Sequence, residues 1–181
     1  MRKSCVVAVC SSSTHSIAKV PKTSINLIAG LGVEGDVHLG STTQHLYLAK
    51  RHPNRSNLTQ VHLLHAELHD LLNDVGFDIS PGLMGENITT RGIDLMSLPA
   101  GTRLNLGKGA IIQVTGFRTP CSKLNRLRPG LMKASFMRDQ CKGLVPNAGI
   151  MGIVVRGGPV RRGDAIEMNL PEKPHLPLQA V

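Results

Sequence analysis

Aromatic side chains are almost missing from this chain of 181 residues, which contains three Phe, one Tyr and no Trp. The core must therefore be built from Val, Ile, Leu and Met. Four aromatic rings also leave no platform on which the bases of a single-stranded nucleic acid could stack. No apolar segment approaches the length that crosses a membrane. These absences argue against a single-strand-binding protein and against an integral membrane protein.

Cysteine spacing excludes two further classes of site. The four cysteines are Cys5, Cys10, Cys121 and Cys141, and no two of them form a Cys-x-x-Cys pair. Zinc-finger and thioredoxin-like motifs are therefore absent. Cys5 and Cys10 would face opposite sides of one strand, so they cannot bridge locally. The apolar start of the chain is too short for a signal peptide, and we predict a cytoplasmic protein with reduced thiols.

Acidic residues are outnumbered, since 21 Lys and Arg against 12 Asp and Glu give a net charge of +9. A basic surface attracts phosphorylated cofactors, nucleic acids or acidic proteins. Nucleic acid is disfavoured, because the chain has no basic run beyond Arg161-Arg162, no zinc-finger spacing and no recognition-helix signature. A basic surface that only keeps the protein soluble is the plainer alternative.

Nineteen Gly and eleven Pro favour many short strands joined by tight turns. Periodicity and composition predict strands over 3–10, 61–65, 88–90, 102–106, 110–115, 152–156 and 165–168, helices over 66–75 and 130–140, a helical turn after residue 121, and loops over 11–24 and 43–58. We predict one mainly-β domain over residues 1–170, a compact β-barrel with a few peripheral helices. A proline-rich tail over 171–181 is expected to drape over the surface or to fray.

One segment, Val114-Thr-Gly-Phe-Arg-Thr-Pro-Cys-Ser-Lys-Leu124, says most about chemistry. Pro120 keeps Thr119 extended, so Cys121 lies where the chain turns from a strand toward a helix. The backbone N–H groups of a helix start and nearby basic side chains such as Arg118 would stabilise a thiolate. A thiolate is a nucleophile, a persulfide carrier or a soft metal ligand. The alternative is a buried structural cysteine.

Two polar pairs lie beside glycine turns. Asp36 and His38 are either aimed at a ligand or are turn-forming residues. In the segment Gly85-Glu-Asn-Ile88, Glu86 supplies a carboxylate. The Asn87 amide could read the edge of a heterocycle, or it could hydrogen-bond its own backbone.

Three histidines, His62, His65 and His69, are spaced by three and four residues, as zinc ligands on a helix often are. However, His62 and His65 fall on a predicted strand, where an odd spacing places them on opposite faces. Glu67 is also misplaced for a His-Glu-x-x-His motif. Ordinary surface or hydrogen-bonded histidines are the preferred interpretation.

Five short motifs follow one another along the chain. They are Gly32-Val-Glu-Gly-Asp-Val-His38, Gln60-Val-His-Leu-Leu-His-Ala-Glu67, Gly85-Glu-Asn-Ile88, Thr115-Gly-Phe-Arg-Thr-Pro-Cys121 and Gly157-Gly-Pro-Val-Arg-Arg-Gly-Asp164. The series resembles the MOSC domain, named for the C-terminal domain of molybdenum-cofactor sulfurases, and it looks most like the stand-alone bacterial type. The resemblance runs from about Val9 to Met168.

The resemblance implies a mostly-β barrel of the pyruvate-kinase-barrel type, with a cleft for molybdenum cofactor (molybdopterin) or a transferable sulfur. The family cysteine falls on Cys121, which ligates molybdenum in relatives that reduce N-hydroxylated compounds. Asn87 falls on a position that lines the pterin pocket, and Arg118 lies in the cysteine motif. The predicted cofactor-binding residues are Asp36, His38, Glu86, Asn87, Arg118 and Thr119, with Cys121 as the catalytic residue and molybdenum ligand.

Three hypotheses share Cys121. The first is a cofactor-dependent reductase of small N-hydroxylated substrates, supplied by an external electron-donor reductase because the sequence shows no flavin, haem or iron–sulfur site. The second is a sulfur carrier charged by a cysteine desulfurase, and the third is a non-enzymatic module that binds or delivers the cofactor. Cys141 is predicted to be dispensable, so activity should survive Cys141→Ala and not Cys121→Ala.

Overall fold

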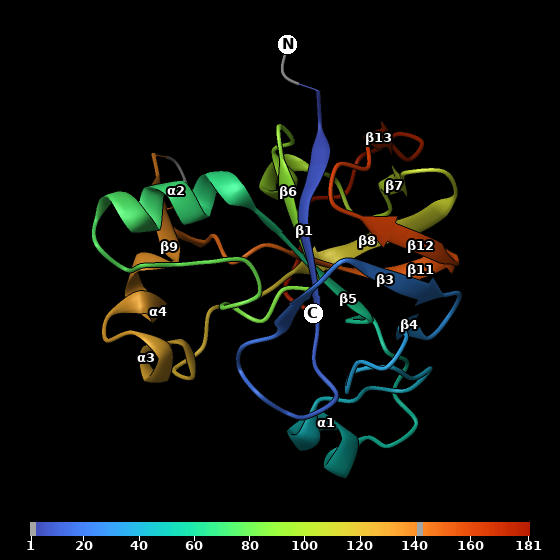
Figure 1. Ribbon diagram of the computed structural model, residues 1–181, viewed down its shortest axis with the longest axis horizontal. Helices are drawn as coiled ribbons and strands as arrows, with labels where there is room; N and C mark the ends of the chain where they lie inside the picture. Colours follow the sequence, from blue (N-terminus) through green and yellow to red (C-terminus); the bar gives the residue numbers. More distant parts are fainter. Residues whose placement is uncertain (1–2, 141–142) are drawn as a thin grey trace.

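The computed structural model describes residues 3–140 and 143–181, so Cys141 and the prediction attached to it lie outside the described residues. Short strands dominate and the helices are peripheral (Figure 1), which confirms the mainly-β prediction. The strands are β1 (Cys5–Ser11), β2 (Val20–Lys22), β3 (Ser24–Ile28), β4 (Gly32–Val33), β5 (Val61–His65), β6 (Ile88–Arg91), β7 (Arg103–Leu106), β8 (Ala110–Phe117), β9 (Phe136–Asp139), β10 (Gly143–Pro146), β11 (Ile150–Arg156), β12 (Gly158–Arg161) and β13 (Ile166–Asn169). The helices are α1 (Leu46–Arg51), α2 (Ala66–Asp74), α3 (Leu124–Leu127) and α4 (Leu131–Ala134), with a 3-10 turn η1 (Leu95–Ser97).

The main sheet has eight strands in the order β13-β7-β8-β11-β5-β6-β1-β2. The strand β5 pairs with β6 in parallel. Two small sheets, β12-β3-β4 and β10-β9, complete the set. Backbone bonds from Val6 N to Asp164 O (2.8 Å) and from Ile166 N to Ser4 O (3.0 Å) bring β1 close to the start of β13. No sheet closes on itself in the described ranges, so the barrel is not confirmed and stays a prediction.

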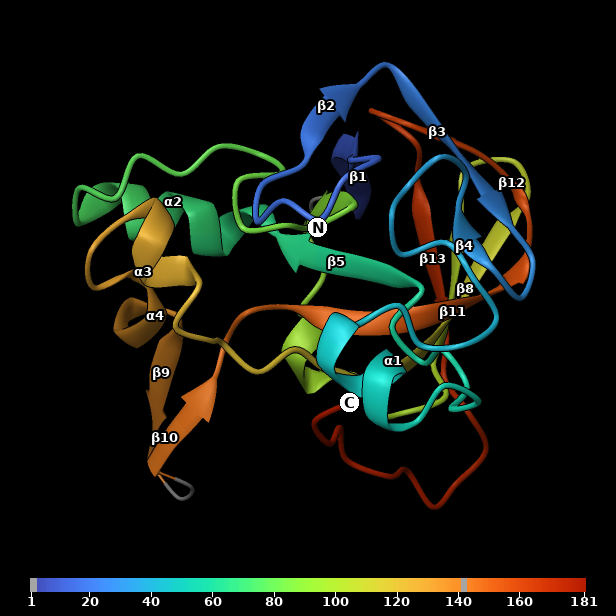
Figure 2. The ribbon, with the colours of Figure 1, turned by 90° about the horizontal axis from the view of Figure 1, so that it is seen from below.

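The central strand β5 separates two apolar clusters. Leu63 packs in the larger cluster, between the main sheet and the β12-β3-β4 sheet. Leu64 points the other way, into a smaller cluster with Leu68 and Leu72 of α2 and Leu124 of α3. The alternation of a strand explains the division, since successive side chains point to opposite faces. Figures 1 and 2 show α2, α3, α4 and the β9–β10 hairpin on one side of the molecule, away from β3, β4 and β12.

Local patterns predicted several elements well. The strand β5 and the helix α2 follow one another as expected, and Gly76 ends the helix with φ 88°. The predicted β7–β8 hairpin is also present. No helix of the described residues is long and apolar enough to span a membrane.

The helix predicted over 130–140 is wrong beyond Ala134. Ser135 donates its hydroxyl to the Leu131 carbonyl (2.8 Å) at the end of α4. The chain then extends into β9, which pairs with β10 in an antiparallel hairpin. Cross-strand pairing overrides the local helical pattern here. The loops predicted over 11–24 and 43–58 likewise contain β2, the first residue of β3 and α1.

The proline-rich tail drapes along the sheet. Ala100 N donates to Leu176 O (2.9 Å), and Phe117 N donates to Gln179 O (2.9 Å). Ala180 forms a parallel bridge with Phe117 at the end of β8. The tail thereby satisfies backbone groups at the end of β8, just before residues 118–124, here called the cysteine segment because they include Cys121.

Candidate functional site

The Asp36 carboxylate joins two loops and a turn. Its Oδ2 accepts hydrogen bonds from Ser12 N (3.1 Å), Asn87 Nδ2 (3.0 Å) and Lys19 Nζ (2.5 Å). Its Oδ1 accepts from the backbone N of His38 (3.0 Å) and lies 3.1 Å from the Nδ1 atom of that histidine. Burial raises the pKa of Asp36, but His38 and Lys19 more than offset it and hold the pKa well below its usual range. Asp36 is therefore an anion that orients His38.

Lys19 is a buried cation that the sequence patterns did not reveal. Its side chain is 5% exposed and that of Asp36 is 2% exposed. Burial lowers the pKa of Lys19, and the neighbouring Asp36 carboxylate opposes that shift. A buried ion pair of this kind fixes geometry, because removing one partner strands the other charge.

Asn87 ties together the strands around this carboxylate. Its Oδ1 accepts from His62 N (3.2 Å), and its Nδ2 also donates to Cys10 O (3.2 Å). Gly85, two residues earlier, has φ 87°, and a Cβ there would lie 2.7 Å from Ile17 O. The turn therefore requires glycine. The Asn87 amide bonds other segments of the protein, and its role toward a pterin stays a prediction.

Glu86 is fully buried beside Asn87. Its Oε1 accepts from Gly82 N (2.7 Å) and Thr89 Oγ1 (3.2 Å), and it lies 3.3 Å from Nε2 of His69. Its Oε2 has no hydrogen-bond partner among the described residues. Burial raises the pKa of Glu86, but the His69 contact, the Gly82 hydrogen bond and the charge of His62 together outweigh it, and the pKa lies below its usual value.

The three spaced histidines go to three different places. His62 is buried on β5, with Nε2 2.8 Å from the Ala148 carbonyl. Burial, followed by the charge of Arg118, lowers the pKa of His62 to about 3. His69 contacts Glu86, and His65 faces a separate hollow. No group of three or more side chains that could hold a metal ion is found among the described residues.

Cys121 is an exposed free thiol in a turn closed by Leu124 N donating to Cys121 O (3.0 Å). Helix α3 begins only at Leu124 and spans four residues. The helix-start stabilisation expected for the thiolate therefore has no support, and the buried structural alternative does not describe this residue. Thr119 is also exposed.

Arg118 supplies the positive charge beside this thiol. Its guanidinium donates to Met84 O (2.6 Å), and its backbone N donates to Gly149 O (3.0 Å), so both ends are anchored. Burial lowers the pKa of Arg118, whereas electrostatic interaction with Cys121 and then with Glu86 raises it. Arg118 therefore links the cysteine segment electrostatically to the Glu86 turn.

Three further cationic or ionisable side chains gather near His38. The His15 and His38 rings form an edge-to-face pair with centroids 5.7 Å apart. Burial lowers the pKa of His45, and the charges of Lys123, His38 and His15 act in the same direction. Lys123 follows Cys121 by two residues, so the charge on this histidine group adjoins the cysteine segment. Neither His15 nor His45 stands in a motif, so sequence reasoning missed them.

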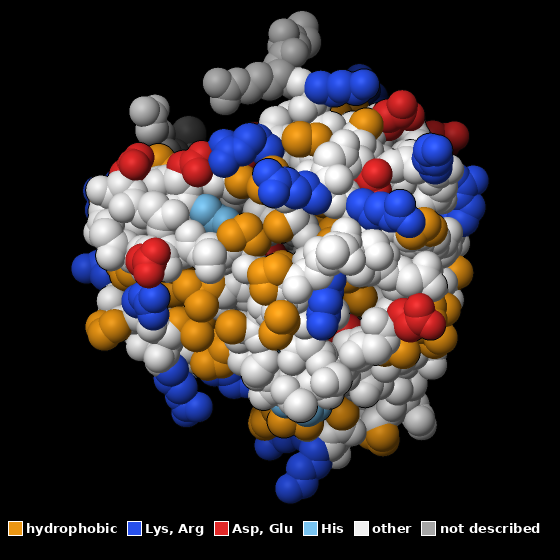
Figure 3. Space-filling model, in the orientation of Figure 1, with side chains coloured by type: hydrophobic (Ala, Val, Ile, Leu, Met, Phe, Trp, Pro, Cys, Tyr) orange, Lys and Arg blue, Asp and Glu red, His pale blue; other side chains and the backbone are white. Residues whose placement is uncertain are grey.

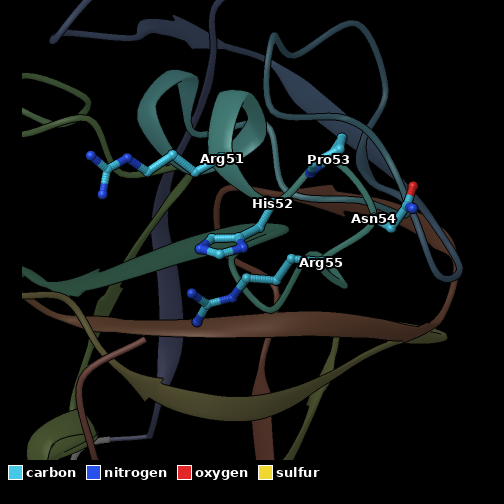
Figure 4. Close-up of a pocket in the computed structure, with 5 residues that line it drawn as sticks. All are labelled: Arg51, His52, Pro53, Asn54 and Arg55. Carbon is cyan, nitrogen blue, oxygen red and sulfur yellow. The ribbon is translucent and has the colours of Figure 1, made fainter.

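A second basic feature lies at the end of α1. The residues 51–55 surround an open hollow of about 540 Å³ (Figure 4). The side chains of His52 and Arg55 lie side by side, whereas Arg51 points away from them and stacks over Tyr47 at 4.8 Å. All five lining residues are exposed. Figure 3 shows Lys and Arg spread over one face of the molecule rather than gathered in a patch. This open hollow is therefore an ordinary part of the basic surface.

Comparison with known proteins identifies a matching family model and several solved structures with a similar fold. The model of the MOSC domain matches residues 34–167. The structure is similar to that of YuaD from Bacillus subtilis, with TM-score 0.73, 22% identity, and coverage of 93% of this chain and 97% of YuaD. It is also similar to YiiM from Geobacillus stearothermophilus (TM-score 0.61, 19% identity, 96% and 77% coverage) and YiiM from Escherichia coli (0.56, 20%, 95% and 73%). A search of curated proteins finds no match.

Proposed function

Because this chain belongs to the MOSC domain family, which is known in molybdenum-cofactor-related proteins, we propose that it binds molybdenum cofactor through Cys121 and reduces N-hydroxylated compounds. The observation that carries the proposal is an exposed thiol beside the anchored cation Arg118. We place this activity in the cytoplasm, where thiols stay reduced.

The residues around the thiol suit an anionic, phosphorylated group. Arg118 uses one guanidinium nitrogen on Met84 O, which leaves other N–H groups of its fork for an anion. Lys123 and the group of His15, His38 and His45 add charge or donors on the same side. A chain of net charge +9 adds a long-range attraction for anions.

In this proposal, the bound cofactor supplies the two-electron redox chemistry, and the protein supplies binding and orientation. The Cys121 thiolate is a soft ligand suited to molybdenum. Asp36 holds His38 by its Nδ1 atom, so that the Nε2 atom of the ring can hold or move a proton. Reduction of N–OH to N–H and water takes two electrons from an external donor reductase and two protons from solvent or such groups.

Exposure of the Cys121 thiol also supports a second candidate, sulfur transfer. A partner cysteine desulfurase would present a persulfide, and the Cys121 thiolate would attack its outer sulfur. The new S–S bond makes Cys121 a persulfide, and the desulfurase thiolate leaves. A module that only binds or delivers the cofactor is the non-enzymatic version of the first proposal.

Molybdenum content of the purified protein separates these candidates. The protein is produced in a host that makes the cofactor, as wild type, Cys121→Ala and the matched control Cys5→Ala. We expect near-stoichiometric metal in wild type and control, and loss in Cys121→Ala. Equal metal in all three would contradict ligation by Cys121. No metal in any of them would favour persulfide transfer. A persulfide on Cys121 adds one sulfur atom, which mass spectrometry detects as an increase of about 32 Da.

A further inference from the structure

A second hollow of about 730 Å³ lies behind the cysteine segment. It is lined by the end of β5, the η1 segment, the β9–β10 hairpin and the C-terminal tail, and Figure 2 shows that hairpin and tail both on the lower side of the view. Phe117 lines the hollow, whereas the next residue, Arg118, belongs to the Cys121 site. Two consecutive residues at the end of β8 thus contribute to two different sites. The volume is in the range of small-molecule pockets.

Two buried polar atoms in the lining have no partner in the described residues. They are Oδ1 of Asn147, whose residue is 4% exposed, and Nδ1 of His65. Such atoms are rare in folded proteins because each loses its bonds to water without replacement. Burial lowers the pKa of His65, which favours the neutral ring, and a neutral imidazole has one acceptor nitrogen. Asn147 Oδ1 is an acceptor as well.

Charge gives the hollow a preference for cations. Asp94 contributes an exposed carboxylate to the lining, and the charges of Glu67 and then of Asp94 raise the pKa of His65 against the effect of burial. No Lys or Arg stands among the described lining residues, although the whole chain carries a net charge of +9. The surrounding walls are apolar and are formed by Met96, Leu98, Phe117, Val145 and Leu178.

We propose that this hollow is a binding site for a small organic ammonium ion with an apolar body. The ammonium has three N–H donors and no acceptor. It is therefore matched to a site that offers the Asn147 amide oxygen, the acceptor nitrogen of the His65 ring and the Asp94 carboxylate, with apolar walls for the rest of the molecule. The inference does not depend on Cys121 or on a molybdenum cofactor.

Calorimetric titration of the full chain with 2-phenylethylamine, which is protonated at pH 7.5, tests the site. Its controls of equal shape are the neutral 2-phenylethanol and the anionic 3-phenylpropanoate. We expect saturable binding of the amine, at least about tenfold tighter than the alcohol, which is the effect of one charge-assisted hydrogen bond, and no binding of the anion. No saturation by the amine, or equal affinity for amine and alcohol, would overturn the proposal.

Variants locate the binding. Asn147→Leu removes the buried acceptor and is expected to weaken amine binding about tenfold. Asp94→Asn is a surface change that should weaken binding about threefold. It provides the test if Asn147→Leu does not fold. The matched control Asp74→Asn and the variant Cys121→Ala should bind as wild type does, whatever the fate of the molybdenum proposal. Unchanged binding in Asn147→Leu and Asp94→Asn would place the amine elsewhere and overturn the assignment.

A lysine side chain carries the same head group on a flexible chain. N-acetyl-lysine-N-methylamide, titrated in parallel, therefore separates a free amine from a protein segment. We expect it to bind more weakly than 2-phenylethylamine, because it lacks a rigid apolar body for the walls formed by Met96 and Phe117. Tighter binding of the lysine derivative would overturn the small-molecule assignment.

Discussion

Asp36 shows how one side chain organises the candidate site at the residue scale. The sequence placed Asp36 and His38 in one loop, and the structure joins them through Oδ1 and Nδ1. What the sequence did not reveal is Lys19, which reaches the same carboxylate from a polar loop 17 residues earlier. Lysine is normally exposed, and nothing local marks this one as buried. The contact exists only because β1 and the Gly85 turn hold the two loops together.

The stability of the protein should depend on pH through His62. Its pKa is lowered to about 3 in the folded state, against about 6.5 in an unfolded chain. Between these values the unfolded state binds a proton that the folded state does not, so stability is lost as pH falls from about 6.5 toward 3. We expect one histidine of this kind to contribute up to about 1.4 kcal/mol per pH unit in that window.

Urea unfolding at several pH values between 4 and 7 measures this contribution. The slope of unfolding free energy against pH should be smaller in His62→Gln than in wild type, whereas the exposed control His52→Gln should keep the wild-type slope. Parallel profiles for wild type and His62→Gln would show that His62 is not held neutral.

At the scale of elements, the sequence predicted best those elements whose stabilising contacts are close in sequence. The β5–α2 unit and the β7–β8 hairpin are specified by residues within a few positions of one another. The strand β12 was missed because its partner is β3, more than 120 residues earlier. The end of α4 at Ser135 was missed for another reason: β10, the partner of β9, is close in sequence, but the helical pattern of residues 130–140 concealed the hairpin.

The tail beside β8 gives an element-scale prediction. A Cβ on Gly116 would collide with the Gln179 carbonyl and the Val181 side chain. Gly116→Ala should therefore displace the tail and free the Phe117 amide from its bond to Gln179 O. We expect hydrogen exchange of the Phe117 amide to become at least about tenfold faster.

Gly109→Ala is the matched control for this prediction. Gly109 lies in the β7–β8 turn, where a Cβ meets only Arg156 Nη2 at 3.8 Å. In Gly109→Ala, the hydrogen-exchange rate of the Phe117 amide should equal the wild-type rate. Wild-type protection of the Phe117 amide in Gly116→Ala would mean that the tail tolerates the added methyl group.

The molecule as a whole separates two kinds of charge. Arg118, Lys123 and nearby histidines make the exposed Cys121 side positive, whereas the hollow behind it offers acceptors and a carboxylate. Composition predicted the net charge of +9 and its attraction for anions. It could not predict the division, because the sign of a local field depends on which side chains the fold brings together.

Alkylation rates of Cys121 report this field. The measured quantity is the rate of alkylation by anionic iodoacetate divided by the rate with neutral iodoacetamide. We expect this ratio to be about threefold or more higher for Cys121 than for free cysteine. It should fall as salt is added, because salt screens the field. Mass spectrometry identifies the modified thiol. Burial raises the pKa of Cys10 to about 12, so that cysteine should stay unmodified in the folded protein.

The variant Lys123→Gln should lower the iodoacetate ratio at Cys121, while Lys22→Gln, on β2, should leave it unchanged. A ratio equal to that of free cysteine, with no dependence on salt, would count against a positive field at the thiol.

The docking of the chain end against Gly116 has a practical consequence for handling the protein. Val181 would lie against any side chain at Gly116, five residues before Cys121 in the sequence. A polyhistidine purification tag fused to the C-terminus would therefore start beside the β8 strand that leads to the thiol, bringing metal-chelating imidazoles near it. For metal analysis the tag is better fused at the other end, ahead of β1.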